Sequence, residues 1–286
     1  MADRFVVAAA GPLFDLLAAH FTTWSRNTLR QRLRLGCINV NGVATDRHDQ
    51  RLQSGDVVTI TGKDDGRVSA ARAVLDVLHV DEQLFAIDKP VGLLSVSSDD
   101  ERDRTALALA KVQLGRGRPV DLWPAHRLDR ETSGVLLFAR TRAVREAVQA
   151  DWENTEKAYH AIVEGHLEPA DGVIEAPLWE DGNLRVRVGE HAETRSARTR
   201  YRTLSRSRSR SHLEVLLDTG RKHQIRAHLA WRGHPVVGDD RYGAAGSRLC
   251  LHAHRLVLRH PGDGRSLQLV APVPKALTAE LALTRS

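Results

Sequence analysis

The middle of the chain carries the stretch His126-Arg127-Leu128-Asp129-Arg130-Glu131-Thr132-Ser133-Gly134, followed directly by the apolar run Val135-Leu136-Leu137-Phe138-Ala139. The apolar run has the length of a strand and predicts one that is buried in a sheet. The nine residues before it, called the 126–134 box below, then form a polar loop held by a packed scaffold. Such a loop can present Asp129 rigidly to a ligand. From the local pattern alone, Asp129 can equally pair with an arginine or cap the turn at 132–134.

The composition limits the classes of protein to which this chain can belong. At 286 residues, with 42% hydrophobic and 27% charged residues, it fits a soluble globular protein with one large and one small domain. No apolar run reaches the length of a membrane span, and the first residues lack the pattern of a secretory signal. Cys37 and Cys250 are too isolated for a disulfide framework or a zinc site. We therefore expect a cytoplasmic protein with no membrane partner.

The charge of the chain indicates a polyanionic partner. The formal net charge is +6, and arginine greatly outnumbers lysine. Guanidinium groups suit phosphates and base edges better than ammonium groups do, which favours a nucleic acid. An arginine-rich composition can also reflect codon bias, and composition alone does not locate a basic surface.

Residues 1–62 are predicted to form a separate small module. One helix is expected over 12–21, and a second from about residue 27 to Gly36. In the second helix Leu29 and Leu33 share one face. Another face carries arginines at every fourth position: Arg26, Arg30 and Arg34.

A short strand, an Asn41-Gly42 turn and a strand that follows Gly55-Asp56 complete this module. Over about residues 12–61 the order of elements resembles the alpha-L RNA-binding motif. The resemblance implies a small α/β RNA-binding domain whose arginine helix lies against phosphates. Without the resemblance, the same arginine stripe fits an ordinary solvated face.

Residues 63–73 are small and polar and predict a linker, so that residues 74–286 form the larger domain. Strands are expected at 74–80 and 84–87, and Pro90 ends the second. Lys89, in the turn between them and the next element, is either a solvated lysine or one that faces an anionic substrate.

Further along, helices are predicted at 102–114 and 142–152, and a strand that carries Tyr159 at 156–163. The repetitive Ser-Arg stretch 205–211 predicts the mobile basic tip of a hairpin. It either touches RNA phosphates or serves only as an exposed solubilising loop.

The second informative stretch is Gly220-Arg221-Lys222-His223-Gln224-Ile225-Arg226, which continues to Asp239. Gly220 predicts a turn, and a helix follows to Trp231 with Ile225 and Leu229 on its buried edge. Arg226 lies off that edge, where it can reach a carboxylate on an adjacent loop.

Together these stretches resemble the RluA family of pseudouridine synthases over nearly all of residues 74–286. The motifs concerned are Lys89-Pro90-Val91-Gly92, the 126–134 box, Lys157-Ala158-Tyr159, the segment 220–242 and Leu251-His252-Ala253. The resemblance implies an α+β protein whose catalytic domain has a mixed, mainly antiparallel sheet. It implies that Asp129 is catalytic, that Arg127 enters the stack vacated by the target uridine, that Tyr159 stacks on the flipped base, and that Arg226 pairs with Asp129.

The implied reaction explains these residue types. Isomerisation of uridine breaks the bond from N1 to the ribose and rejoins the base through C5, so no atom is gained or lost and neither cofactor nor metal is expected. A carboxylate can add to the anomeric carbon or take a ribose proton to give a glycal. Both routes need a charged Asp129, which a neighbouring guanidinium favours. We expect a monomer that acts on RNA, with 23S rRNA favoured over tRNA because of the added RNA-binding module.

Two other classes remain open at this point. In a non-catalytic RNA-binding protein the basic helix would matter and Asp129 would be structural. In a metal-dependent hydrolase the ligands would come from histidines such as His223, His228, His252 and His254. No acidic partner accompanies these histidines at the ligand spacing of a helix face, which favours hydrogen-bonding or core roles.

Overall fold

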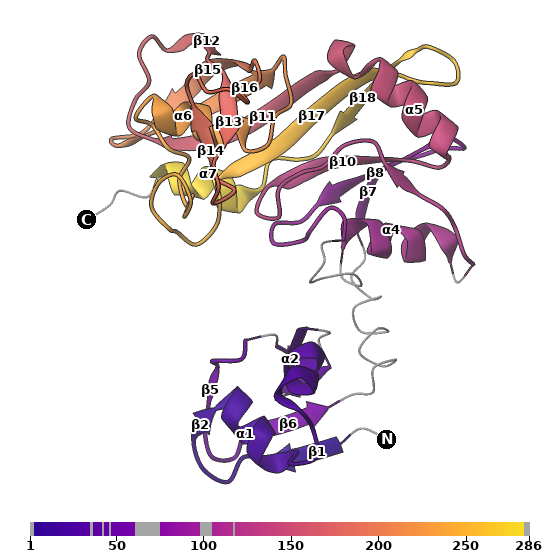
Figure 1. Cartoon of the computed structure of the whole chain (residues 1–286), viewed down its shortest axis with the longest axis vertical. Coiled ribbons are helices and arrows are strands. Elements are labelled where there is room, and N and C mark those ends of the chain that lie inside the picture. The colour runs from indigo at the N-terminus through magenta and orange to yellow at the C-terminus, as the bar shows by residue number, and fades with distance from the viewer. Residues whose placement is uncertain are drawn as a thin grey trace. The chain divides into compact units, whose positions relative to one another are not determined.

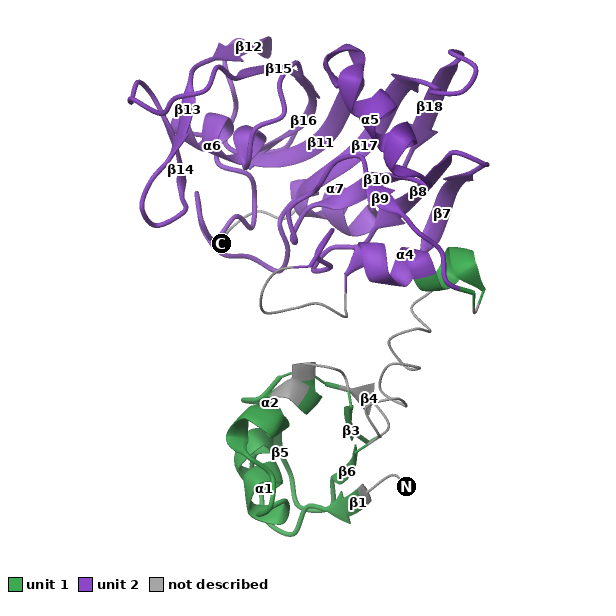
Figure 2. Cartoon of the chain, turned by 45° about the vertical axis from the view of Figure 1, so that its right-hand side comes forward, with its two compact units in different colours: residues 1–74, 98–104, 112–118 green, residues 75–97, 105–111, 119–286 purple. Residues whose placement is uncertain are grey.

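The computed structural model describes residues 3–34, 37–41, 43–45, 47–60, 75–97, 105–116 and 118–282. The chain divides into two compact units (Figure 2). Unit 1 comprises residues 1–74, 98–104 and 112–118, and unit 2 comprises residues 75–97, 105–111 and 119–286. The predicted linker 63–73 lies outside the described residues.

In its described residues up to Ile60, unit 1 combines two short helices with a small antiparallel sheet. The helices are α1 (Leu13–His20) and α2 (Arg26–Arg34). The sheet has the order β1 (Asp3–Val6), β6 (Val57–Ile60), β3 (Ile38–Val40) and β4 (Val43–Ala44). A separate pair joins β2 (Gly11–Pro12) and β5 (Arg51–Leu52). Strands β3 and β4 pair antiparallel, as the sequence predicts, while Gly42 of the expected turn lies outside the described residues. Leu29 and Leu33, which share one face of α2, are both buried in the core of the unit.

Unit 2 is built on one large mixed sheet (Figure 1). Its order is β12 (Asp171–Glu175), β15 (Arg198–Arg206), β16 (Arg210–Leu217), β11 (Glu156–Glu164), β17 (Leu251–Arg259), β10 (Ser133–Ala139), β8 (Leu84–Lys89) and β7 (Asp76–Val80). Two more strands join its middle: β18 (Ser266–Val270) pairs with β17, and β9 (Trp123–Pro124) pairs with β10. A small hairpin joins β13 (Leu178–Glu180) and β14 (Val186–Val188). The pairing of β10 with β17 is parallel and the other pairings are antiparallel, so the expected mixed, mainly antiparallel α+β fold is confirmed.

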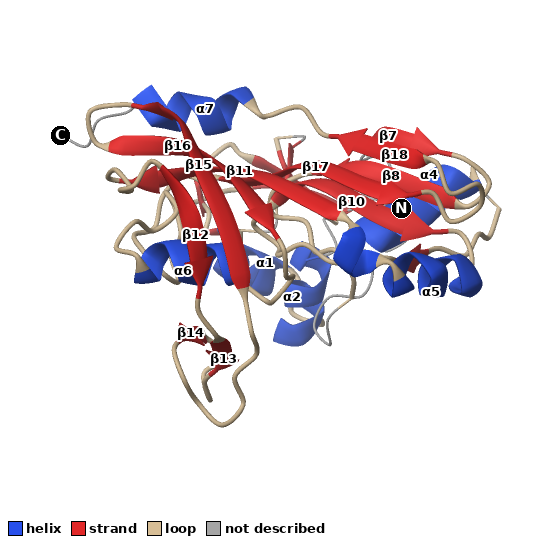
Figure 3. Ribbon diagram, turned by 90° about the horizontal axis from the view of Figure 1, so that it is seen from above, coloured by secondary structure: helices blue, strands red, loops and turns tan. Residues whose placement is uncertain are grey.

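Helices cover both faces of this sheet. They are α4 (Ala106–Gly115), α5 (Arg142–Ala150), the single-turn η1 (Trp152–Asn154), α6 (Gln224–Trp231) and α7 (Lys275–Ala282). Figure 3 shows α5 and α6 on one face and α7 on the opposite face. The helix predicted at 142–152 is α5, which ends two residues earlier, at Ala150. The helix predicted to follow the Gly220 turn is α6, which begins at Gln224 and ends at Trp231 as expected.

The 126–134 box leads into the centre of the sheet, as its sequence predicts. All seven residues of β10 are buried, because neighbours flank the strand on both sides and helices cover it. Gly134 is required where β10 meets β17, since it has φ +116° and an added Cβ would lie 2.2 Å from the carbonyl oxygen of Ala253. This close approach anchors the end of the box to β17.

The Ser-Arg stretch 205–211 forms the expected hairpin, but the interpretation as an exposed loop is wrong for its last residues. Strand β16 begins at Arg210, which is only 5% exposed. Its guanidinium donates to Glu280 at 3.0 Å and approaches Glu164 at 3.4 Å. Both Arg210 and Ser211 are buried at the start of β16, and two carboxylates compensate the buried charge of Arg210.

Candidate active site

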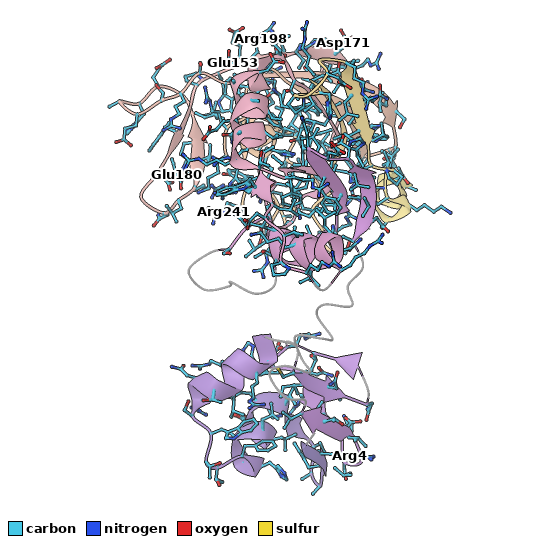
Figure 4. All side chains as sticks on the ribbon, turned by 90° about the vertical axis from the view of Figure 1, so that its right-hand side faces the viewer. Arg4, Glu153, Asp171, Glu180, Arg198 and Arg241 are labelled. Atoms are coloured by element: carbon cyan, nitrogen blue, oxygen red, sulfur yellow. The ribbon has the colours of Figure 1, made fainter. Side chains whose placement is uncertain are left out.

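A cleft of about 1020 Å³ lies in unit 2 on the sheet face that carries α5 and α6. Residues of β10, β11 and β17 contribute to its lining, and the two helices contribute from either side. Arginine and lysine outnumber aspartate and glutamate around it. Arg241 lines it from the loop after α6 and is labelled in Figure 4. The cleft therefore has the charge expected of a surface that accepts a polyanion.

The structure brings Asp129, Tyr159 and Arg226 together in this cleft, and Arg127 lines it as well. These residues come from the box, β11 and α6, which are distant in sequence. Arg127 is exposed, as a residue that contacts RNA must be. The roles expected for these four side chains in catalysis and RNA binding stay predictions, but their common location agrees with them.

The segment 89–95 holds the residues on either side of Asp129. The Ser95 hydroxyl donates to the Leu128 carbonyl at 2.7 Å and accepts from the Leu128 N–H at 3.0 Å. The Arg130 carbonyl accepts from the Gly92 N–H at 2.9 Å and from the Lys89 ammonium at 3.1 Å. Because both neighbours are bonded to the scaffold, the Asp129 carboxylate is presented from a restrained backbone.

Lys89 differs from both interpretations made from the sequence. It is neither solvated nor part of the cleft lining, because its side chain is fully buried. The ammonium donates to three carbonyls: Pro90, Leu93 and Arg130. Burial lowers the pKa of Lys89 to about 8, although Glu131, Asp129 and Asp88 act in the opposite direction. Lys89 thus holds the 126–134 box through the Arg130 carbonyl from a buried position. Its assignment as a substrate-binding residue is wrong, because its ammonium group does not reach the cleft.

Arg226 joins two carboxylates. It donates to Asp129 Oδ2 at 3.2 Å from one terminal nitrogen, which is the pairing that the resemblance implies. Its stronger partner is Asp239, which accepts from Nε at 2.7 Å and from Nη2 at 2.8 Å. Burial lowers the pKa of the Arg226 guanidinium, but the carboxylates of Asp239 and Asp129 outweigh burial and raise it above its ordinary value. A bidentate pair of this kind fixes the plane of the guanidinium.

Asp239 is the main partner of Arg226, and the sequence analysis did not single it out. It is fully buried and also accepts backbone N–H groups of Arg241 and Tyr242, both at 3.1 Å. Gly238 before it has φ +76°, and an added Cβ would lie 1.8 Å from the Arg248 carbonyl oxygen. The available signal was an acid that follows the apolar Val236-Val237 and Gly238, since an acid beside an apolar run needs a partner when it is buried.

Tyr159 lies on β11 in the floor of the cleft, half-buried. Burial, and secondarily the charge of Asp129, raises the pKa of its hydroxyl. The hydroxyl therefore stays protonated through the physiological range. A neutral aromatic ring beside the Asp129 carboxylate suits the predicted stacking on a base.

The box histidine has a structural role. His126 Nε2 accepts from the Leu137 N–H at 3.2 Å, and its ring stacks on Trp152 at 5.0 Å between centroids. Burial lowers the pKa of His126 to about 4, so the ring is neutral and can act as this acceptor. The box is thereby tied to β10 at its first residue.

Among the described residues, no group of three or more histidine, cysteine, aspartate or glutamate side chains is arranged to hold a metal ion. Two histidines considered as ligands above are fully buried and bonded elsewhere. His228 pairs with the Thr199 hydroxyl at 2.8 Å and with the Ala176 carbonyl at 3.0 Å. His252 Nδ1 lies 3.0 Å from the Ser133 hydroxyl.

In the part of the chain that the structure describes, no helix is long and apolar enough to cross a membrane.

The N-terminal arginines are described within unit 1 alone. Arg26 and Arg30 are exposed on α2, and their guanidinium groups lie 5.7 Å and 5.5 Å from the centroid of the Phe14 ring. The backbone of Arg34 continues the same helix, while its side chain lies outside the described part. The Phe14 ring thus contacts two exposed guanidinium groups, those of Arg26 and Arg30, which can bind phosphates.

The sequence was compared with known families and proteins. The profile of the family described as RNA pseudouridylate synthase matches residues 83–231. A ribosomal large subunit pseudouridine synthase D of Xylella fastidiosa is 34% identical, over 97% of this chain and 90% of that protein. An uncharacterized RNA pseudouridine synthase of Mycobacterium bovis is 32% identical, over 100% of this chain and 99% of that protein.

A solved structure gives the same result for the fold. The human RNA pseudouridylate synthase domain containing 4 superposes with a TM-score of 0.62 at 26% identity. The match covers 76% of this chain and 95% of that chain.

Proposed function

Because this chain belongs to the RluA family of RNA pseudouridine synthases and isomerises uridine in RNA, we propose that the cleft of unit 2 is its active site and Asp129 its catalytic residue. The observation that carries the proposal is the hydrogen bond from Arg226 to Asp129 within a basic cleft that Tyr159 also lines. A carboxylate, a guanidinium and an aromatic ring are the groups that a base-flipping isomerase without redox chemistry needs.

In the first step Asp129 acts at the ribose. Its carboxylate either adds to the anomeric carbon as N1 leaves, or removes a ribose proton to give a glycal. The detached uracil turns and C5 bonds to the anomeric carbon, either as the bond from Asp129 to that carbon breaks or as the ribose regains its proton from Asp129. The C5 proton is then lost, and N1 gains a proton. Arg226 holds the carboxylate in place during these steps with a charge-assisted hydrogen bond.

The uridine must leave its stack before Asp129 can reach the sugar. Arg127 is exposed at the cleft and is proposed to fill the vacated space. Tyr159 is proposed to stack on the extruded base and hold the detached uracil while it turns. The cationic groups around the cleft would bind the flanking phosphates.

For the RNA target we propose 23S rRNA. The support is that several relatives with about 30% identity or more over most of the chain are named ribosomal large subunit pseudouridine synthase D. Residues 1–62 are proposed to be an RNA-binding domain, with Arg26, Arg30 and Arg34 against phosphates, joined by residues 63–73 to the catalytic domain 74–286. An rRNA substrate implies a cytoplasmic enzyme, and we propose that it acts as a monomer.

The test has one arm for the catalyst and one for the target. Asp129→Asn should abolish pseudouridine formation and leave RNA affinity unchanged, because the carboxylate is lost and the phosphate contacts remain. Retained turnover would exclude Asp129 as the catalyst. Pseudouridines should be mapped by carbodiimide and primer extension in rRNA and tRNA from wild-type cells, deletion cells and deletion cells with Asp129→Asn. A site lost from tRNA and not from 23S rRNA would overturn the proposed target.

A further inference from the structure

His223 has a backbone conformation that residues other than glycine rarely adopt. It precedes α6 with φ 51° and ψ 18°, in the left-handed region. A residue other than glycine in this region is uncommon, and such strain is often kept where a side chain must be aimed. The imidazole lines the cleft, and its Nε2 lies 3.6 Å from Asp129 Oδ2.

The residue after it keeps this turn in place. Gln224 is 2% exposed, and its side-chain oxygen accepts from the Thr219 hydroxyl at 2.8 Å and the Arg221 N–H at 3.0 Å. Its side-chain nitrogen donates to the Arg198 carbonyl at 3.1 Å and the Thr199 hydroxyl at 3.0 Å. A side chain that uses both donor and acceptor in this way fixes the start of α6. The direction of the His223 side chain is therefore set by the scaffold.

The hydrogen bonds around Tyr242 determine which imidazole nitrogen carries the proton. The Val186 N–H donates to the Tyr242 hydroxyl at 3.0 Å, and the same hydroxyl lies 2.9 Å from His223 Nδ1. Since the hydroxyl already accepts from Val186, its own proton is free to go to Nδ1. A neutral imidazole that accepts at Nδ1 carries its proton on Nε2, the nitrogen that faces Asp129.

The charges that face His223 agree with a neutral ring. Burial lowers its pKa, and the cations of Arg226, Lys222 and Arg241 lower it further. Asp129 acts in the opposite direction without reversing the result. The neutral tautomer with Nε2–H is thus the form that faces the carboxylate.

We propose that His223 is a positioning residue for Asp129 and that Tyr242 sets its tautomer. Arg226 and His223 both approach Oδ2, so neither occupies Oδ1, and the pair would present Oδ1 to the sugar of the flipped nucleotide. At 3.6 Å the Nε2 contact is longer than a hydrogen bond, and such contacts tighten in the substrate complex. The inference rests on the proposed role of Asp129.

A neutral His223 is useful here because its Nε2–H can hold Asp129 Oδ2 without placing a second positive charge, beside that of Arg226, next to the reacting carboxylate. An imidazolium would pair with the carboxylate and compete with the sugar for it. The Tyr242 hydroxyl opposes protonation at Nδ1. Its removal should raise the pKa of His223 and extend the inhibited, protonated form to higher pH.

The central experiment is the pH profile of the single-turnover rate on an rRNA transcript, from about pH 5 to 8.5. Tyr242→Phe removes one hydroxyl and keeps the ring beside the Arg226 guanidinium, 5.3 Å from its centroid, so folding is little at risk. We expect the acid limb of the profile to move to higher pH by roughly half a unit or more. The matched control is Tyr201→Phe, whose hydroxyl bonds to Pro169 away from the cleft lining.

Two His223 variants test the positioning role. His223→Ala should lower the single-turnover rate by up to about 100-fold with unchanged RNA affinity, because the carboxylate loses a restraint. His223→Gln supplies a neutral amide donor and should recover part of the rate without the pH shift of Tyr242→Phe. The control is His166→Gln at an exposed histidine outside the cleft lining.

The outcomes separate this inference from the proposed function. A Tyr242→Phe profile that superposes on that of Tyr201→Phe would overturn the tautomer assignment. A His223→Ala rate equal to that of His166→Gln would overturn the positioning role. If Asp129→Asn is inactive in the same assay, either result removes only the inference about His223; if Asp129→Asn is active, the proposed function itself fails.

Discussion

The two carboxylates that bind Arg226 should have opposite importance for stability and for catalysis. Asp239 is fully buried and accepts two short bonds from the guanidinium. Removing one partner of a buried pair costs about 3–5 kcal/mol, and Asp239→Asn should lie near the lower end because the amide oxygen still accepts. Asp129 has a side chain that is 29% exposed and accepts one bond at 3.2 Å. Asp129→Asn should therefore cost no more than about 1 kcal/mol.

Turnover should show the reverse order. Asp129→Asn removes the reacting group and should leave no detectable product. Asp239→Asn keeps the reacting group and only loosens the guanidinium that holds it, which should lower the single-turnover rate by about 10–100-fold. RNA affinity should be similar in both variants, because neither change removes a cation from the cleft.

Stability is best followed as the urea midpoint by near-UV circular dichroism, and turnover as tritium released from RNA labelled at uridine C5. Asp171→Asn is a suitable control, since Asp171 is exposed on β12, outside the cleft lining, and is labelled in Figure 4. If Asp129→Asn lowered the midpoint more than Asp239→Asn, the view of Asp239 as the main support of Arg226 would be wrong. An Asp239→Asn enzyme with the control's rate would show that this support does not serve catalysis.

Three further predictions concern other parts of the chain. Tyr159→Phe should retain appreciable turnover because the ring stacks, whereas total loss would indicate proton transfer by the hydroxyl. Burial lowers the pKa of His252 to about 4 from 6.5. Because only the unfolded state then binds this proton between those values, stability should fall with decreasing pH by up to about 1.4 kcal/mol per pH unit, and His252→Gln should reduce that slope in urea titrations. Deleting residues 1–62 should weaken RNA binding and flatten its salt dependence, since phosphate contacts are lost; equal affinity at all salt concentrations would contradict the role of the arginine helix.

Much of the fold was predictable because it depends on local patterns. The apolar run 135–139 and the glycine before it predict a buried central strand, which is β10. The spacing of Ile225 and Leu229 predicts the buried side of α6. Such periodicities and turn residues act over a few positions, so they can be read without knowledge of the partner elements.

The candidate site was predictable in its members and in the pairing of Arg226 with Asp129, but not in its other connections. The motifs indicated Asp129, Tyr159 and Arg226, and the structure places all three in one cleft. That Arg226 is held mainly by Asp239, and that Lys89 is buried beneath the box, followed from no local pattern.

The sequence by itself therefore determined the secondary structure around the site, the fold class and the chemical groups available for catalysis. The tertiary structure decided which groups meet and which are shielded from water. Asp129 and Arg226 are 97 positions apart, and their contact depends on the sheet order, which places the start of β10 and the loop before it next to β17 and β11. Burial and ion pairing are properties of that assembled environment, so they assign roles to side chains such as Lys89 and His223 that residue type alone leaves open.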